Sequence, residues 1–528
     1  MRIDFVHIRS RFKNLEDFRI DLNENYMETV LLGQNATGKS NFIEALVLIF
    51  KHLDLDKPAP FAYTIQYVCR EKLIEISTDE KGKYKYSVDS TPIKTQTEFR
   101  RRKQELLPKY VFTYYSGISN RLKDHFDEHQ LKFYDKIIKP NTRKEEVDDL
   151  RKLFYVQLIH SYFVLMAYFS FEADEKDSIA FLNEVLHIED LESILFVLKQ
   201  PQWSRGKKEA KTDRFWTAAG LVREFLDKLW GLTLAPIYND EPVKIDFRTS
   251  EIQEKLYLYI STKQKLRQLA GYYNDNTDFF KALESTYISD LIDEVRVKVK
   301  KRNVDGEVTF KELSEGEQQL LTVLGLLRFT KDEESLILLD EPDTHLNPLW
   351  KWKYLEYLRT VVKRPETTQI IINTHDPLLI GSLVKEQVRM FKRQKDTGKV
   401  YAIEPDVDPK GLGVAGILTS DLFDLPTILD KETQENLNRK RYLQGKLMRE
   451  GLTDSEKEEF NILKDNLARY GGYYDVTNDA WYNRYLEEIS KNALFQKVEF
   501  SEEEKEILER ESREILEQML KEKTDTAL

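Results

Sequence analysis

The spacing of apolar residues changes along the chain, and these changes divide the chain into predicted strands and helices. Regular alternation is typical of half-buried strands, and short apolar runs bounded by polar residues also indicate strands. On this basis strands are predicted at residues 4–12, 18–22, 27–33, 62–69, 72–77, 83–88 and 109–117. Residues 41–52 have the pattern of a helix. The first 117 residues are therefore predicted to be rich in strands around one early helix.

From residue 118 to about 228 the pattern is mostly helical. Residues 154–171 (FYVQLIHSYFVLMAYFSF) are unusually apolar. Gln157, His160 and Ser161 interrupt them and charges flank them closely, so a buried helix is favoured over a membrane span. No heptad is sustained, which predicts a compact helical insertion and not a long coiled coil. Residues 201–214 read as an exposed basic loop.

Predicted strands return after this insertion, at residues 230–238, 243–247 and 255–261, and helices follow at 263–292. Residues 294–310 read as a hairpin that turns at Asp305 and Gly306. Arg296, Lys298 and Lys300 point to one side of it and make the best candidate for a basic face, although an ordinary exposed strand face is favoured.

The end of the chain is predicted to hold two strands, at 388–394 and 400–405, and then mainly helices. Thr453 with Glu456, and Ser501 with Glu504, have the spacing of helix capping boxes. The last helix carries an apolar stripe on a charged background, which fits either packing on its own protein or docking of a partner.

Composition limits the classes of protein that remain. A chain of 528 residues is long enough for two to four domain-sized units. Lys and Arg total 81 against 92 Asp and Glu, a net charge of -11, so any nucleic-acid surface must be a local basic patch. The one cysteine, Cys69, excludes an internal disulfide framework and suits a reducing cytosol. The N-terminus lacks the apolar core of a signal peptide, and we expect a cytoplasmic protein.

The stretch LLGQNATGKSNFIEALVLIF carries the first chemical signal. It places a glycine-rich loop, Gly33 to Ser40, between a predicted strand and a predicted helix, which is the context of a phosphate-binding P-loop. Backbone N–H groups and the positive helix end meet the phosphates of a nucleotide there. Lys39 supplies a point charge, and the Ser40 hydroxyl is placed to ligate Mg²⁺. The predicted nucleotide-binding residues are Gly33, Gln34, Asn35, Ala36, Thr37, Gly38, Lys39, Ser40 and Asn41.

A second anion site is predicted at the start of a later helix. The segment LSEGEQQ, residues 313–319, opens the apolar run LLTVLGLLRF. A serine and a glycine at a helix N-terminus offer donors and a free hydroxyl to a γ-phosphate. Because the chain already holds phosphates at its P-loop, this second site is useful only on the nucleotide of another subunit. Its predicted residues are Ser314, Glu315, Gly316 and Glu317.

Two buried strands deliver the remaining candidates at their carboxyl ends. SLILLDEPDTHLNP ends its apolar run in Asp340, which can hold Mg²⁺ through water, and Glu341, which can polarise the attacking water. QIIINTHDP ends in His375, which can bond a γ-phosphate and sense its loss. A lone histidine at a strand end is usually structural, but four such segments in this order indicate a nucleotide-hydrolysing site.

These four segments resemble the Walker A, signature, Walker B with D-loop, and switch-histidine motifs of ABC-type ATPases of the SMC, RecF and OLD-like branch. In that family two heads enclose two ATP molecules, and each P-loop faces the signature serine of the partner. The resemblance covers about 1–117 and 226–400. It implies that Lys39 and Ser40 bind phosphate and Mg²⁺, that Ser314 and Gly316 act in trans, that Asp340 holds metal, and that Glu341 is catalytic. It also places Asp343 in the D-loop and makes His375 the switch.

A narrower resemblance rests on DPKGLGVAGILTSDLFDLPTILD, ETQENLNRKRYLQGKL, LTDSEKEEF and a YGG turn, with LPKYVFTYYSG upstream. These segments look like those of the PtuA ATPases of Septu and related retron-linked anti-phage systems. The resemblance implies a PtuB-type HNH nuclease as the partner and the ATPase oligomer as its regulatory scaffold. One departure is the lack of a glutamine at the end of VFTYYSG, where many ABC ATPases sense metal and water, and Ser116 is the residue found there.

Two other functions compete with this one. A self-contained OLD-like nuclease would need a metal site with a glutamate and a DxD pair on strands. Asp406 and Asp408 match the DxD pattern and lie between Pro405 and Pro409, but no upstream strand with the paired glutamate is evident. A DNA-repair ATPase of the SMC or RecF kind would instead bind DNA directly. The fold expected in every case is α/β, an ABC-type P-loop ATPase head with a two-part mixed sheet. Its expected parts are the head at 1–117 and 226–400, the helical insertion at 118–225 and the helical C-terminal region at 401–528.

Overall fold

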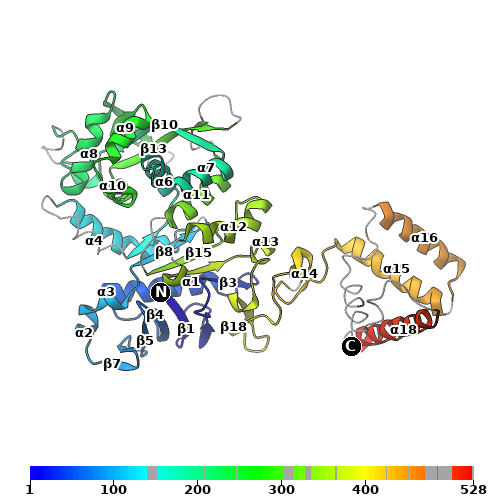
Figure 1. The fold of residues 1–528 in the computed structure, drawn as a ribbon. Coiled ribbons are helices and arrows are strands. Elements are labelled where there is room, and N and C mark those ends of the chain that lie inside the picture. The colour runs from blue at the N-terminus through cyan, green and yellow to red at the C-terminus, as the bar shows by residue number, and fades with distance from the viewer. Residues whose placement is uncertain are drawn as a thin grey trace. The chain divides into compact units, whose positions relative to one another are not determined.

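The computed structural model describes residues 1–117, 119–139, 152–206, 210, 212–244, 248–302, 308–309, 313–327, 334–362, 365–423, 425–449, 451–469, 485 and 502–525. It divides into two compact units, Met1–Asp408 and Pro409–Leu528 (Figure 1). The finer division predicted from the sequence, with boundaries after residues 117, 225 and 400, stays a prediction.

The N-terminal part of the first unit is an antiparallel six-stranded sheet in the order β2-β1-β4-β5-β6-β7. Its strands alternate buried and exposed side chains, as the sequence pattern predicts. The strands are β1 (Arg2–Ile8), β2 (Phe18–Asp21), β4 (Tyr63–Cys69), β5 (Lys72–Thr78), β6 (Tyr84–Val88) and β7 (Thr91–Ile93). Two short helices follow, α2 (Gln96–Arg101) and α3 (Lys103–Leu106).

The central sheet has seven strands in the order β18-β17-β3-β16-β15-β8-β9, and all are parallel except the edge strand β18. Every residue of β15 and β16 is buried, which explains why their sequences are continuous apolar runs. The strands are β3 (Glu28–Gly33), β8 (Tyr110–Tyr115), β9 (Leu153–Tyr155), β15 (Ser335–Asp340), β16 (Thr368–Asn373), β17 (Val388–Arg393) and β18 (Val400–Ile403). The helices α12 (Pro348–Val361) and α13 (Pro377–Ile380) follow β15 and β16.

The helix α1 (Lys39–Leu55) lies between these two sheets and shares one hydrophobic core with both. Three rings show the connection: Phe18 of β2, Phe42 of α1 and Phe391 of β17 lie with their centroids 5.1 to 6.1 Å apart. Burying such rings stabilises each by about 1.5–3 kcal/mol relative to exposure. The start of α1 is therefore held firmly against the carboxyl ends of the central strands.

The segment between β9 and β15 forms a second lobe on the same unit (Figure 1). It contains an antiparallel sheet in the order β11-β12-β10-β13-β14. Its strands are β10 (Ile188–Lys199), β11 (Ile237–Lys244), β12 (Ser250–Ile260), β13 (Ile292–Lys301) and β14 (Val308–Thr309). The helices of this segment are α6 (Ile159–Ser170), α7 (Lys176–Val185), α8 (Gly220–Leu232), α9 (Lys263–Ala270), α10 (Asn276–Ile288) and α11 (Glu315–Leu327). The helix α4 (Asp127–Ile137), which precedes β9, packs against α8 and α10.

The insertion was predicted to be mostly helical, and the strand β10 within it, the central strand of this sheet, was missed. Ile188, Leu191 and Ile194 are buried at a spacing of three residues, which imitates a helix. The spacing arises from irregular registers between β10 and β13, at Ile188/Asp190 and Leu191/Ser193. The predicted strand at 230–238 was also wrong in its first part, because α8 continues to Leu232 and β11 starts at Ile237.

The apolar segment at 154–171 is a buried helix in most of its length, as predicted. Ten of the twelve residues of α6 are buried, and the helix packs against α9, α10 and α11. Its contact with α11 is close, since the Tyr168 hydroxyl donates to the carbonyl oxygen of Gly325 at 3.0 Å. In the part of the chain that the structure describes, no helix is long and apolar enough to cross a membrane.

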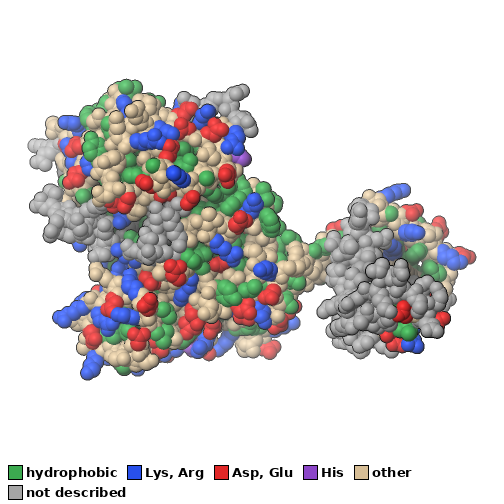
Figure 2. Space-filling view, in the orientation of Figure 1, with side chains coloured by type: hydrophobic (Ala, Val, Ile, Leu, Met, Phe, Trp, Pro, Cys, Tyr) green, Lys and Arg blue, Asp and Glu red, His purple; other side chains and the backbone are tan. Residues whose placement is uncertain are grey.

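The predicted basic face on β13 is largely paired with acidic groups. Arg296 lies 2.8 Å from Glu294, and Lys300 lies 3.5 Å from Glu189. Figure 2 shows Lys and Arg intermingled with Asp and Glu over the visible face of the first unit. The antiparallel pairing of β13 with β14 confirms the hairpin, whereas its turn at Asp305 and Gly306 lies outside the described residues.

The second unit contains α14 (Gly413–Thr419), α15 (Lys431–Arg449), α16 (Asp454–Arg469) and α18 (Glu502–Asp525). The capping box at α16 is confirmed, because the Thr453 hydroxyl accepts from the Glu456 N–H at 3.4 Å and the Glu456 carboxylate accepts from the Thr453 N–H at 2.9 Å. Ser501, the cap predicted for the last helix, lies outside the described residues, as does the YGG turn at 470–472.

Candidate functional site

The loop Gly33–Ser40 joins the carboxyl end of β3 to the first turn of α1, as predicted. Gly33 and Gly38 have φ of 142° and 101°, values that side-chain-bearing residues rarely adopt. A Cβ atom on Gly38 would also lie 2.8 Å from the Asn14 side-chain oxygen. Gln34, Asn35 and Ala36 are exposed at the tip of the loop. These glycines let the backbone turn so that the helix begins at Lys39.

Lys39 is buried and folds back over the loop that precedes it. Its Nζ donates to the carbonyl oxygens of Gly33, at 2.6 Å, and Gln34, at 3.1 Å. The Thr37 hydroxyl also donates to the Gln34 carbonyl, at 2.7 Å. Burial lowers the pKa of Lys39 to about 8, although the carboxylates of Glu341 and Asp340 act in the opposite direction. The ammonium group is therefore already held inside the curve of the loop.

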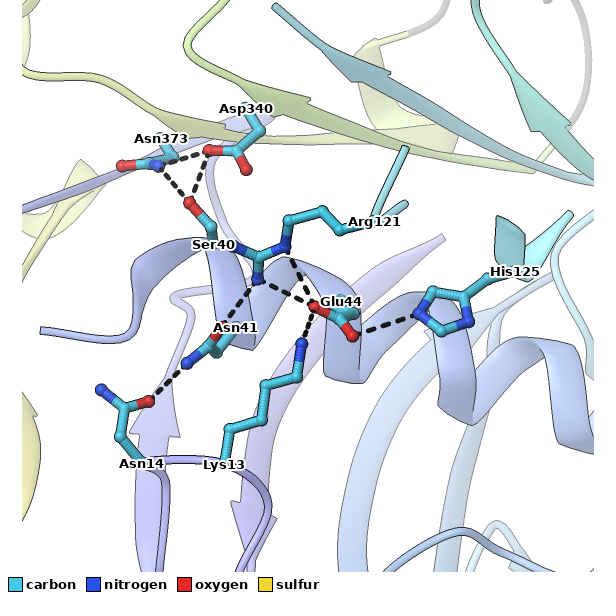
Figure 3. A network of polar contacts seen from close by, with 9 residues as sticks. All are labelled: Lys13, Asn14, Ser40, Asn41, Glu44, Arg121, His125, Asp340 and Asn373. Carbon is cyan, nitrogen blue, oxygen red and sulfur yellow. Dashed lines mark hydrogen bonds and ion pairs between the residues drawn. The ribbon is translucent and has the colours of Figure 1, made fainter. Parts of the chain in front are cut away.

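Ser40, in the first turn of α1, meets Asp340 and Asn373, which end the strands β15 and β16 (Figure 3). The Ser40 hydroxyl donates to Asp340 Oδ1 at 3.1 Å, and the Asn373 amide donates to the same oxygen and to Ser40 Oγ at 3.3 Å. Burial raises the pKa of Asp340, and the hydrogen bonds from Asn373 and Ser40 oppose this rise. The other carboxylate oxygen, Oδ2, is buried with no hydrogen-bond partner.

This donor set fits a Mg²⁺ ion. Mg²⁺ prefers hard oxygen ligands and binds through one or two protein groups, with water and phosphate in its remaining positions. A hydroxyl and a buried carboxylate with one unpartnered oxygen supply such groups beside the loop. A buried polar atom without a partner costs about 1–3 kcal/mol, which a cation would offset. Ser40 and Asp340 are thus the residues that would hold the ion.

Glu341 and His375 lie beside this group at the ends of β15 and β16. Glu341 has φ of 54°, a strained value for a residue with a side chain, and its N–H donates to the Asn373 carbonyl at 2.8 Å. Its Oε1 lies 3.6 Å from His375 Nε2, and the two side chains are 41% and 37% exposed. Burial lowers the pKa of His375, and the nearby charge of Lys39 acts in the same direction. The pair is therefore accessible to a small substrate such as water.

Asp343 lies deeper in the same loop and is almost fully buried. Its Oδ2 accepts from the Thr374 hydroxyl at 2.9 Å. Burial raises the pKa of Asp343 to about 6 in spite of that hydrogen bond. Ser116, at the end of β8, donates its N–H to the Asp340 carbonyl at 3.2 Å, and its hydroxyl lies 2.9 Å from the Thr344 hydroxyl. Ser116 thus occupies a strand end beside Asp340.

The signature segment begins α11 with a capping box. The Ser314 hydroxyl accepts from the Glu317 N–H at 3.3 Å, and the Glu317 carboxylate accepts from the Ser314 N–H at 2.8 Å. A Cβ atom on Gly316 would lie 2.5 Å from the His345 carbonyl oxygen, so only glycine fits against that loop. Glu315 is exposed and lies 3.1 Å from the His345 ring. The signature segment and the loop after Asp340 are therefore packed together.

Sequence reasoning missed three residues that contact the predicted ones. Asn373 joins Ser40 to Asp340, and its position at the end of an apolar strand was a usable signal. Glu44 and Arg121 form a polar cluster beside Asn41, and nothing local in the sequence indicated it.

Asp408, the second aspartate of the DxD pair, accepts a hydrogen bond from the backbone N–H of Lys385 at 2.9 Å.

A parallel sheet whose strand β3 runs through a glycine-rich loop into α1, with Asp340 at the end of a neighbouring strand, defines a P-loop protein. Residues 29–381, two thirds of the chain, match the family described as "AAA domain, putative AbiEii toxin, Type IV TA system". The chain belongs to this family of ATPases.

Comparisons with single proteins give partial or remote matches. The Septu protein PtuA of Bacillus mycoides (strain KBAB4) is 27% identical over 212 residues, which make up 37% of this chain and 28% of that protein. The match thus spans less than a third of the relative. Among solved structures, the SMC head domain from Thermotoga maritima is 11% identical, with 77% of this chain and 100% of that one covered and a TM-score of 0.31. The recombination mediator protein RecF is 15% identical, with coverages of 76% and 98% and a TM-score of 0.28.

Proposed function

We propose that this chain binds ATP with Mg²⁺ at Gly33–Asn41, hydrolyses it in the cytoplasm, and uses the bound nucleotide to join two copies of itself. The observation that carries this proposal is the convergence of Ser40, Asp340 and Asn373 beside the loop, with Glu341 next to them. The membership in an ATPase family supports the choice of nucleotide.

Each residue has a separate task in this proposal. The backbone N–H groups of the loop and the ammonium group of Lys39 bind the β- and γ-phosphates. Ser40 and Asp340 hold Mg²⁺, which when bound neutralises charge on the phosphate oxygens. Glu341 orients a water molecule for attack and accepts its proton. His375, 3.6 Å from Glu341, hydrogen-bonds the γ-phosphate and changes partner when that phosphate leaves.

The signature segment supports a shared site. Ser314, Glu315, Gly316 and Glu317 form a helix N-terminus whose first serine and glutamate are exposed. Anions bind well at such ends. In the proposed dimer the Ser314 hydroxyl and the backbone N–H groups of this helix start donate to the γ-phosphate held by the P-loop of the partner, while Asp343 and its loop lie at the same junction. A single copy then contains two half-sites and completes neither.

A mixing experiment tests the shared site. Ser314→Arg and Lys39→Ala should each abolish hydrolysis when assayed alone, because each spoils one half of every site. When equal amounts are mixed, about half of the dimers pair unlike copies, and each of these contains one intact site out of two. Hydrolysis should therefore return to about one quarter of the parental rate, measured as phosphate release.

The matched control for Ser314→Arg is Thr453→Arg, which removes the same kind of capping box from α16 in the second unit. We expect that variant to hydrolyse ATP at the parental rate. A mixture no more active than its two separate variants would show that the sites are not shared between copies.

We further propose that the ATPase is the sensor and regulatory scaffold of an anti-phage complex and controls a separate HNH-type nuclease. The 27% identity to the Septu protein PtuA supports this part. The helices of the second unit offer a docking region outside the ATPase head, and α18 is a long charged helix as predicted.

Deletion of residues 481–528 tests the docking role. ATP binding should persist, because every proposed nucleotide contact lies in Met1–Asp408. Co-purification of an HNH nuclease encoded beside this chain should be lost. The measurement is an affinity pull-down of the co-expressed pair, together with titration of a fluorescent ATP analogue, and retention of the nuclease by the shortened chain would contradict the proposal.

A further inference from the structure

A buried carboxylate lies one helical turn beyond the phosphate loop and gathers three basic side chains. Glu44 of α1 has a side chain that is only 5% exposed. It accepts hydrogen bonds from Lys13, from Arg121 at 2.8 and 3.2 Å, and from His125 Nε2 at 3.1 Å (Figure 3). These partners come from two segments far apart in the sequence, the loop after β1 and the segment after β8.

The charges in this cluster do not cancel. Burial alone would raise the pKa of Glu44, but the hydrogen bonds from His125, Lys13 and Arg121 together lower it to about 2. Glu44 is therefore ionised, and it faces two permanent cations, Lys13 and Arg121. One positive charge is left in excess next to the start of α1.

Arg121 also connects to the phosphate loop through a chain of hydrogen bonds. Its Nη2 donates to Asn41 Oδ1 at 2.7 Å, and Asn41 Nδ2 donates to Asn14 Oδ1 at 2.6 Å. Asn14 Nδ2 in turn donates to the carbonyl oxygen of Ala36, at the tip of the loop, at 3.1 Å. The rigid, planar fork of a guanidinium holds Asn41 and Glu44 at the same time through separate nitrogens, whereas a lysine offers all its donors from one nitrogen.

The position of Arg121 in the chain gives these contacts a consequence. It lies between β8 and the short helix Lys123–His125, which leads directly into α4. α4 packs against α8 and α10, helices of the second lobe. The segment that starts at Arg121 is thus one packed route from the nucleotide site to that lobe, and it follows the strand that lacks a terminal glutamine.

We propose that Arg121 is a positioning residue that transmits occupancy of the phosphate loop to residues 122–137 and through them to the second lobe. Phosphates bound at the loop are attracted by the excess positive charge, and they strengthen the series of hydrogen bonds that joins Arg121, Asn41, Asn14 and Ala36. The segment 122–137 then becomes more firmly held against α1. This inference rests on the proposed binding of ATP at Gly33–Asn41.

The chain offers a matched control, because the same segment is tied to α1 at a second place. Lys57, just after the end of α1, lies 2.5 Å from Glu128, and His129 lies 3.0 Å from Asp54. These contacts hold α4 to the far end of α1. Loss of the Lys57 contact loosens the segment without touching the phosphate loop.

The experiment is amide hydrogen exchange of the full chain, with and without a non-hydrolysable ATP analogue, in the parental protein and in Arg121→Gln and Lys57→Gln. The analogue should slow exchange within 122–137 in the parental protein and in Lys57→Gln, which starts from faster exchange. In Arg121→Gln the analogue should still bind, yet the slowing within 122–137 should be lost. kcat should fall by about 2- to 30-fold, the range of coupling mutations, while KM stays within about threefold.

Arg121→Lys keeps the charge and should restore part of the kcat but little of the slowed exchange, because a single ammonium nitrogen lacks the fixed fork that spans Asn41 and Glu44. If Arg121→Gln unfolds, this conservative variant carries the same comparison. Retained slowing in Arg121→Gln, or equal loss of it in Lys57→Gln, would overturn the inference while leaving the ATPase intact. Failure of the parental protein to bind the analogue would instead overturn the proposed function, and this inference with it.

Discussion

Glu341→Gln is expected to slow ATP hydrolysis by about 10²- to 10⁴-fold, the usual contribution of a positioned general base. The amide that replaces the carboxylate cannot take a proton from the attacking water. ATP should still bind, because Lys39, Ser40 and the loop backbone are unchanged. Two copies should therefore accumulate as an ATP-bound dimer, which phosphate release and analytical ultracentrifugation would measure together.

The matched control for this variant is Glu356→Gln, which neutralises an exposed glutamate on α12, away from β15 and β16. It should hydrolyse ATP like the parental protein. If Glu341→Gln also hydrolysed at the parental rate, Glu341 would not be the catalytic carboxylate. Asp343 would not be an obvious replacement, since it is buried and already accepts from Thr374.

Lys39→Ala should weaken ATP binding by about 10- to 100-fold. A charge-assisted hydrogen bond is worth about 1.5–3 kcal/mol, and the substitution removes such a bond to phosphate. It also removes the Lys39 hydrogen bonds to the carbonyl oxygens of Gly33 and Gln34, although Gln34 keeps the bond from the Thr37 hydroxyl. Titration with a fluorescent ATP analogue gives the affinity.

Lys51→Ala is the control for Lys39→Ala, because Lys51 is on the same helix but three turns further from the loop. Its affinity should match that of the parental protein, and equal melting temperatures would show that all three chains are folded. If Lys39→Ala bound ATP at the parental affinity, the assignment of Gly33–Ser40 as a phosphate-binding P-loop would be contradicted.

The fold was predictable where side chains alternate regularly or form one continuous apolar run. The strands β4, β5 and β6 alternate, and β15 and β16 each contain an apolar run, so their positions were correct within a residue or two. β10 was missed because irregular registers place its buried residues three apart. A sequence pattern reports the spacing of buried residues, and bulges change that spacing without ending the strand.

The candidate site was predictable where function depends on a local segment. The loop Gly33–Ser40, Asp340, Glu341 and His375 each follow a recognisable strand, and the structure brings them together. Arg121 and Glu44 are 77 residues apart, and their contact depends on how the chain leaves β8 and returns to α1. Pairing of that kind is set by tertiary packing, which no single window of sequence contains.

The order of strands in the central sheet has a consequence for synthesis of the protein. In the described chain β3 pairs with β16 and β17 alone, and Thr368, where β16 starts, comes 335 residues after Gly33 (368 minus 33). At about 5–20 residues per second, the ribosome needs about 20–70 s to make that interval. During this time both edges of the apolar strand β3 are unpaired, and unpaired strand edges promote aggregation. The β3 strand, and the phosphate loop that follows it, therefore gain their neighbours in the central sheet only after most of the chain has been made.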